Sequence, residues 1–209
     1  MSVRIFVEGV ADKKFLEDYL SFLSDNEESI NNNDFKIIET KGWSNLKSNS
    51  DDGELIRVQM TENSDDDGVN LLIFDADADF SERFNQLEEL KQKYTLNFDI
   101  FLWPNNSDSG DLEVVLENII NPINLPIFDC WEKYEKCLMS KKIEGRNVPL
   151  TTPAKKTKIY GYLEALLGDS RKQKKKIKED NRDYKNNKHW NLDSEYLSGL
   201  RNFIITHIN

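Results

Sequence analysis

Acidic residues follow the ends of three apolar segments in the first half of the chain. The segments are residues 3–7 (VRIFV), 69–74 (VNLLIF) and 98–103 (FDIFLW). In an open parallel sheet the carboxyl ends of the strands meet at one edge, so we expect these acids to converge there. They are Glu8, Asp12, Asp75, Asp77, Asp79, Asp111 and Glu113. Asp12 belongs to the set because it lies about one helical turn beyond Glu8.

Converging carboxylates raise each other's pKa unless a cation lies between them. A divalent cation removes the repulsion, and Mg²⁺ needs only one or two direct carboxylates, since water or phosphate completes its shell. The sequence therefore predicts a Mg²⁺ or Mn²⁺ site with Asp75 and Asp77 at its centre. Two of the acids have a second interpretation as N-caps, because Asp79 directly precedes a predicted helix and Asp111 begins one.

The elements that must position these acids alternate along the chain. Apolar β-rich runs predict four strands, and apolar residues at helical spacing predict four helices between and after them. The strands are at 3–7, 35–40, 69–74 and 98–103, and the helices at 11–23, 54–62, 80–94 and 111–120. The alternation predicts an α/β fold, a Rossmann-like parallel sheet with helices on both faces, over residues 1–125. Helices predicted at 128–140, 157–167 and 193–207 make residues 126–209 a mostly helical part that packs on the first.

The charge of the chain is divided between its two parts. The net charge is −10, but residues 1–130 carry 10 basic and 28 acidic residues, net −18, and residues 131–209 carry 18 and 10, net +8. Residues 171–188 hold nine basic and three acidic residues. Such clustering is typical of a surface that contacts nucleic-acid phosphates, and a solvated helix or loop is the alternative. The candidate contacts are Lys155, Lys158, Lys174, Lys175 and Lys176, with Lys156 and Lys41 as candidates to neutralise a reacting phosphate.

Composition excludes several classes of protein. Cys130 and Cys137 are too few for a disulfide scaffold, and their spacing of seven predicts buried free thiols on one helix face. No apolar run approaches the ~18 residues of a membrane span, and the first ten residues lack the apolar core of a secretory signal. We therefore expect a cytoplasmic protein without a membrane partner.

Three motifs together resemble the Toprim domain of topoisomerases, bacterial primases and the nucleases of the overcoming-lysogenization-defect (OLD) family. They are VEGVADKKFLEDYL from residue 7, LLIFDADAD from residue 71 and NNSDSGDLEVVLENI from residue 105. The likeness covers roughly residues 3–120 and is greatest to a small uncharacterised bacterial Toprim-like family. The chain departs from topoisomerases and primases after the Asp-x-Asp pair, where Ala78-Asp79-Phe80 stands, and it has no Walker-type G-x-x-x-x-G-K.

The resemblance implies roles for the acids. Glu8 matches a general acid/base or metal-linked glutamate, and Asp75 and Asp77 match a Mg²⁺-binding pair. Asp12, Asp111 and Glu113 match the carboxylates of a second metal in OLD-like nucleases. The resemblance thus implies a Mg²⁺-dependent nuclease or related phosphoryl-transfer enzyme acting on DNA or RNA, with Glu8, Asp75 and Asp77 in catalysis. Lys156 lies outside the resemblance and joins the catalytic candidates only as the basic group that could neutralise a reacting phosphate.

Other functions remain open on the sequence. A Toprim-like module could bind nucleic acid or nucleotide without cleaving it, and an acidic edge could serve a protein partner in an interaction subunit. A homodimer and a separate ATPase partner are further expectations. The number of metal ions, one or two, is also open.

Overall fold

The core of the computed structural model, which describes residues 2–27, 30–31 and 35–207, is a four-stranded parallel sheet. Its order is β2–β1–β3–β4, and the strands are β1 (Val3–Val7), β2 (Phe35–Glu39), β3 (Val69–Asp75) and β4 (Asp99–Trp103). Each begins and ends within a residue of its predicted bounds. β3 is central, and five of its seven residues are buried, as expected of an apolar strand covered on both faces.

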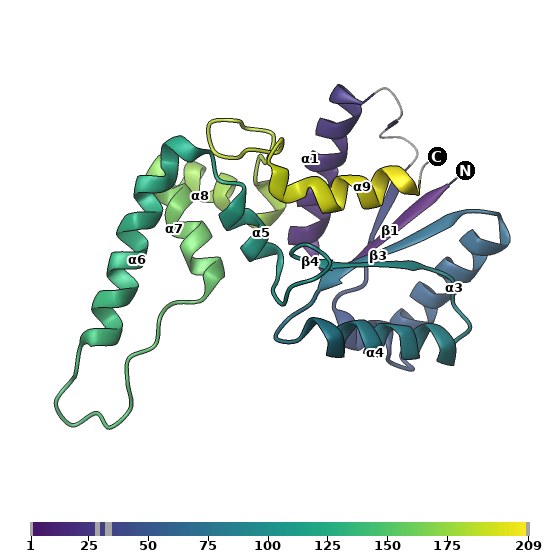
Figure 1. Ribbon diagram of the computed structural model, residues 1–209, viewed down its shortest axis with the longest axis horizontal. Helices are drawn as coiled ribbons and strands as arrows, with labels where there is room; N and C mark the ends of the chain where they lie inside the picture. The colour runs from purple at the N-terminus through teal and green to yellow at the C-terminus, as the bar shows by residue number, and fades with distance from the viewer. Residues whose placement is uncertain (1, 28–29, 32–34, 208–209) are drawn as a thin grey trace.

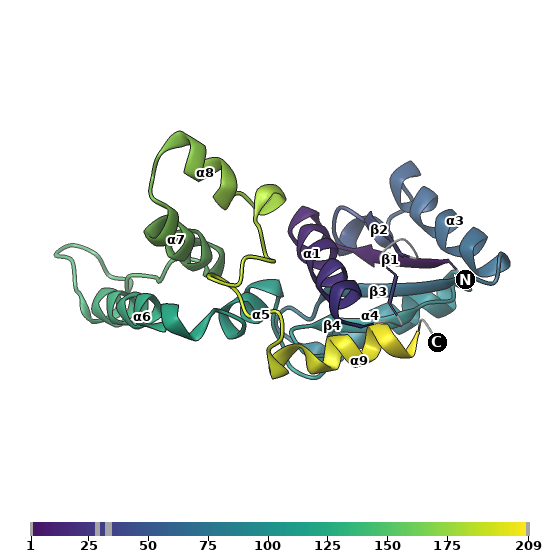
Figure 2. The ribbon, with the colours of Figure 1, turned by 90° about the horizontal axis from the view of Figure 1, so that it is seen from above.

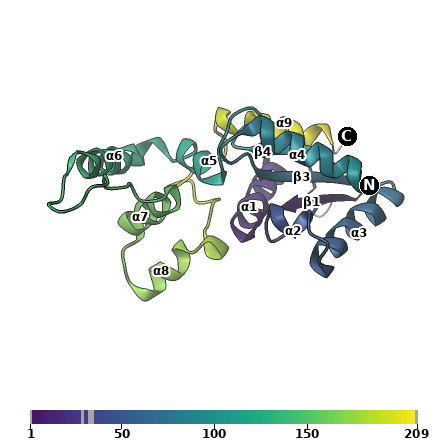
Figure 3. The same ribbon diagram turned by 90° about the horizontal axis from the view of Figure 1, so that it is seen from below.

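Helices cover both faces of the sheet, which confirms the predicted α/β class. One face carries α1 (Val10–Asn26), α5 (Leu112–Asn118) and α9 (Ser198–Thr206), and the other carries α3 (Asp51–Asp65) and α4 (Phe80–Lys93). Figure 1 shows α1 and α9 above the strands and α3 and α4 below them, and Figure 3 shows the lower layer from beneath. The apolar residues form a separate core on each side, as the two-faced packing of a parallel sheet requires.

The second part of the chain is helical but does not lie in one place. The helices α6 (Leu125–Ser140), α7 (Lys155–Leu167) and α8 (Arg171–Ile177) form a lobe to one side of the sheet, as Figure 2 shows. Within this helical lobe, α7 packs against α6 and α8, and also against α5. The chain then returns through the 3₁₀ turns η3 (Glu179–Asn181) and η4 (Glu195–Leu197) to α9, whose Phe203 ring lies 5.4 Å from that of Phe101 on β4.

Both cysteines are exposed, so the prediction of buried thiols is wrong. The reason is that α6 packs on α7 through residues other than the two cysteines. Phe128 packs on Tyr162 with ring centroids 5.2 Å apart, and the indole of Trp131 lies against Gly161. Cys130 and Cys137 lie outside this contact. No helix in the described ranges is long and apolar enough to cross a membrane.

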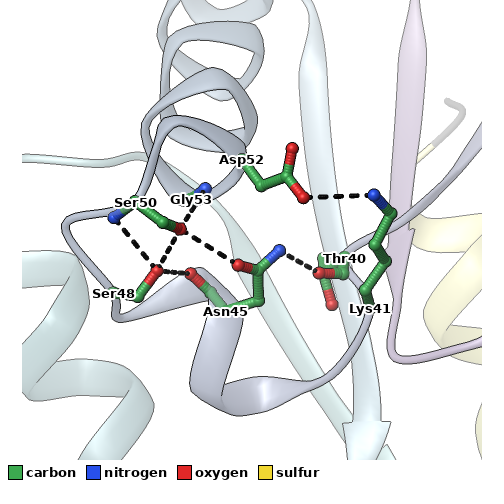
Figure 4. Close-up of polar contacts among 7 residues, drawn as sticks. All are labelled: Thr40, Lys41, Asn45, Ser48, Ser50, Asp52 and Gly53. Atoms are coloured by element: carbon green, nitrogen blue, oxygen red, sulfur yellow. Dashed lines mark hydrogen bonds and ion pairs between the residues drawn. The ribbon is translucent and has the colours of Figure 1, made fainter.

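A polar turn joins β2 to the lower layer, and it contains the short helix α2 (Trp43–Leu46), which the sequence pattern did not predict. Asn45 donates to the carbonyl of Thr40 at 2.8 Å and accepts from the Ser50 hydroxyl at 3.2 Å. Ser50 also caps α3, because its Oγ accepts from the Gly53 N–H at 3.3 Å (Figure 4). These bonds start α3 three residues earlier than predicted. They also hold the chain in place around Trp43, which contributes to the site described below.

Gly53 is required by this turn, and we expect Gly53→Ala to destabilise the fold by about 1–2 kcal/mol. An added Cβ would lie 2.4 Å from the carbonyl oxygen of Asn45 and 2.7 Å from that of Ser48. The gain of about 1 kcal/mol in helix propensity is smaller than the cost of displacing two backbone carbonyls. Chemical denaturation should show the loss. Glu54→Ala, at the next, exposed position of the helix, should show at most the smaller loss, below about 1 kcal/mol, of one acidic side chain near a helix N-terminus. A Gly53→Ala protein as stable as wild type would contradict this account of the turn.

Candidate metal and phosphoryl-transfer site

The strand order reverses between β1 and β3, since the chain runs outward from β1 to β2 and then returns to β3 and β4. Such a switch point opens a crevice at the carboxyl ends of the two strands, where ligands bind in open α/β sheets. Glu8 directly follows β1, and Asp75 is the last residue of β3. These two residues, both expected from the sequence at strand ends, therefore lie at the same switch point.

Glu8 is held at the switch point by two backbone N–H groups. Its Oε1 accepts from the Asp75 N–H and its Oε2 from the Trp43 N–H, both at 3.2 Å. Gly42, at φ 98°, turns the chain so that its own N–H reaches the Glu8 carbonyl at 2.9 Å. Burial raises the pKa of the Glu8 carboxyl, and these N–H donors and the nearby Arg83 oppose the increase.

Asp12 lies near Glu8 in the first turn of α1 and is 7% exposed. Its Oδ2 accepts from the Gly9 N–H at 3.1 Å, and its Oδ1 accepts from the indole N–H of Trp103 at 3.0 Å. Burial, followed by the charge of Glu8, raises the pKa of Asp12 to about 7.

Asp75 completes a group of three carboxylates. Its Oδ1 accepts from the Leu112 N–H, at the start of α5, at 3.1 Å. Burial raises its pKa to about 8, and the charges of Asp12, Glu8 and Asp111 add to the effect. The charge of Glu8 adds to the increase in the pKa of Asp12, and the charges of both add to that of Asp75, so Glu8, Asp12 and Asp75, called here the switch-point triad, are close enough for their charges to interact.

Asp77 has a cationic partner, unlike the triad, and its charge adds to the increase in the pKa of Glu8. Its backbone takes a left-handed conformation, φ 53°, and its N–H donates to the Gly110 carbonyl at 2.8 Å. Its carboxylate forms an ion pair with Arg83 of α4, and the Arg83 guanidinium lies 5.0 Å from the ring of Trp43. Arg83 was not among the residues expected from the sequence. The one available signal was a lone cation in the acidic stretch after β3.

The remaining predicted ligands have local partners. Asp79 caps α4 and Asp111 caps α5, each accepting a backbone N–H at 3.0 Å, so the N-cap interpretation is confirmed for both. Glu113, in the first turn of α5, has a raised pKa because of burial and the charge of Asp111, and Lys156 opposes the increase.

Most of the predicted basic residues are paired with acids of the same chain. Lys155 contacts Asp111 at 3.1 Å, Lys156 contacts Glu179 at 2.5 Å, Lys158 contacts Glu117 at 2.9 Å, Lys174 contacts Glu164 at 3.2 Å and Lys41 contacts Asp52 at 3.1 Å. Lys175 and Lys176 are exposed in the last turn of α8, and no ion pair is recorded for them within the described ranges. The structure thus brings the first turn of α7 to the sheet edge through the contact of Lys155 with Asp111. It also brings Glu179 beside Lys156, and Glu179 was not among the residues predicted from the sequence.

Within the described residues, no group of three or more acidic, histidine or cysteine side chains is arranged to hold a metal ion. The seven predicted ligands therefore do not form one preformed set. The triad nevertheless fits a hard divalent cation, because Mg²⁺ requires only one or two carboxylates. Within the described residues the carboxyl groups of the triad have N–H groups as their hydrogen-bond partners. A cation there would oppose the increase in their pKa values, which burial causes and the neighbouring carboxylates strengthen.

Comparison with known proteins gives one match. The chain matches the family described as a protein of unknown function, DUF3226, over residues 2–208. No curated protein and no solved structure matches it. The match extends over both the sheet domain and the helical lobe, so the two parts are features of the family. The chain belongs to the DUF3226 family.

Proposed function

We propose that this protein is a Mg²⁺-dependent nuclease, or a related phosphoryl-transfer enzyme, that acts on nucleic acid through the switch-point triad. One observation carries the proposal. Glu8, Asp12 and Asp75 converge at the switch point, the edge of the sheet where open parallel sheets bind ligands, and none of them forms an ion pair with any side chain that the structure describes. Burying three carboxyl groups without an ion-pair partner is costly for folding, and a bound divalent cation would offset that cost.

Each residue of the triad has a distinct part in the proposal. When bound, a divalent ion supplies Lewis-acid polarisation of a substrate phosphate. Glu8 and Asp75 would hold it, since both lie at the open edge of the sheet and their orientation is fixed by backbone donors. Asp12 and Asp75, with pKa values of about 7 and about 8, hold protons in a large fraction of metal-free molecules at neutral pH. Both would release them as the ion enters.

The basic groups supply charge for the polyanion. Lys156 approaches the site from α7, and it is the candidate to neutralise phosphate charge in the transition state. Farther out, Lys174, Lys175 and Lys176 form the exposed end of α8. A nucleic-acid backbone would displace weak surface ion pairs such as that of Lys174 with Glu164, which are worth at most about 1 kcal/mol.

A cleavage assay tests the proposal. Labelled single- and double-stranded DNA and RNA are incubated with the protein in Mg²⁺, Mn²⁺ or EDTA. We expect cleavage of at least one substrate with a divalent ion and none with EDTA. Binding without cleavage in every arm would leave a non-catalytic nucleic-acid module, and neither binding nor cleavage would contradict the proposal.

A further inference from the structure

The strand-end acids fall into two groups with different partners. In the switch-point triad the partners are N–H dipoles: those of Trp43 and Asp75 for Glu8, and that of Leu112 for Asp75. The second group lies toward the helical lobe and consists of Asp111, Glu113 and Glu179. This group, called here the lobe-side acids, has lysine partners.

Two ammonium groups occupy the lobe-side acids. The Lys155 Nζ lies 3.1 Å from Oδ2 and 3.2 Å from Oδ1 of Asp111, so it bridges both oxygens of the carboxylate. The Lys156 Nζ lies 2.5 Å from Oε1 of Glu179, whose side chain is 14% exposed. The charges of Glu113 and Lys156 also interact.

The placement of these lysines is unfavourable for the helix that carries them. Lys155 and Lys156 are the first two residues of α7, where the helix dipole favours acidic side chains and disfavours cations by about 0.3–1 kcal/mol. No side chain caps this end of α7. Helix stability therefore does not explain the two lysines, whereas neutralisation of Asp111 and Glu179 does.

We infer that Lys155 and Lys156 occupy the position of a second cation, so that the site takes a single divalent ion, at the switch-point triad. This inference rests on the proposed function and specifies its metal stoichiometry. A second ion at Asp111 or Glu113 would have to displace the Lys155 ammonium or lie beside that of Lys156, and both arrangements are opposed by charge repulsion. The lysines would then contribute to the phosphate-binding charge of the reaction without metal ligands of their own.

The number of ions bound per chain tests the inference. Mn²⁺ binding is measured by isothermal titration and by the electron paramagnetic resonance of free Mn²⁺, with wild type, the double variant Lys155→Met/Lys156→Met and the control Lys158→Met. Methionine keeps most of the side-chain stem and removes the charge. The control removes a lysine from the same helix, but the ion pair that it breaks is with Glu117, which belongs to neither group of acids. Circular dichroism confirms that each variant is folded, and Lys155→Met alone replaces the double variant if that does not fold.

We expect one ion per chain in wild type and in the control, and two in the double variant, with the affinity of the first ion changed less than threefold. Two ions in wild type, or one in a folded double variant, would overturn the inference and leave the proposed function standing. No ion in wild type would overturn both.

Discussion

Replacing Asp75 by asparagine is expected to make the metal-free protein more stable at pH 8.5 by about 2 kcal/mol, although the residue lies in the candidate site. The pKa of Asp75 is raised from 3.8 to about 8. Between these values the folded protein binds a proton that the unfolded chain has released, so stability falls as the pH rises from about 4 to about 8. Asparagine cannot ionise, and its Oδ1 can still accept from the Leu112 N–H. The variant should therefore avoid the loss.

Thermal unfolding in EDTA at pH 5 and pH 8.5 measures this effect. We expect the variant to melt roughly 4–8 °C above wild type at pH 8.5, and the difference to shrink at pH 5. Mg²⁺ should raise the melting temperature of wild type at pH 8.5 and have little effect on the variant. Asp79→Asn is the matched control, because asparagine caps a helix as well as aspartate does. A variant less stable than wild type at pH 8.5 would show that the Asp75 carboxylate stabilises the fold.

Glu8→Gln is expected to reduce metal-dependent cleavage by at least about 100-fold, the lower range for loss of a general acid or base. The change removes one charge from the triad and also disturbs its geometry. The carboxylate accepts one N–H on each oxygen, whereas the glutamine amide has a single acceptor, so one backbone N–H would face an NH₂ group. The unsatisfied donor costs about 1–3 kcal/mol, and rates must therefore be normalised to the folded fraction.

Glu39→Gln is a close control for Glu8→Gln. Glu39 ends β2, next to β1 in the sheet, and is paired with Val7 in the strand register. Its carboxylate contacts Lys13 at 3.5 Å and lies outside the triad. We expect cleavage by Glu39→Gln to stay within threefold of wild type. Equal cleavage by the two variants would point to a contaminating nuclease or to catalysis by other residues.

The strands and the convergence of Glu8, Asp12 and Asp75 could be predicted from the sequence for a simple physical reason. A buried parallel strand must be an almost continuous apolar run, and its end is therefore visible wherever the first charged residue appears. Parallel pairing then brings the ends of β1 and β3 to one edge, and α1 carries Asp12 to the same edge one turn later.

The orientation of Asp77 and the presence of Glu179 could not be predicted in this way. Beyond the strand end, alternation no longer determines where a side chain points, and Asp77 is turned by its bond to Gly110 and its pairing with Arg83. Glu179 approaches Lys156 only because the helical lobe folds back, and local pattern carries no information on such a contact. The exposure of Cys130 and Cys137 could not be predicted either. Helical spacing shows that the two cysteines share a face of α6, but it does not show that α7 packs on a different face.

A crystal structure of the protein soaked in Mn²⁺, with the ion located by its anomalous scattering, tests the central claim most directly. We predict an ion at the switch point between β1 and β3, with direct oxygen ligands from Glu8 or Asp75, water in the rest of its shell, and Lys155 still on Asp111. Crystals of Asp75→Asn should show markedly reduced occupancy at this position. A switch point without Mn²⁺ at millimolar concentration, or ions bound only elsewhere, would contradict the assignment of the triad as a metal site.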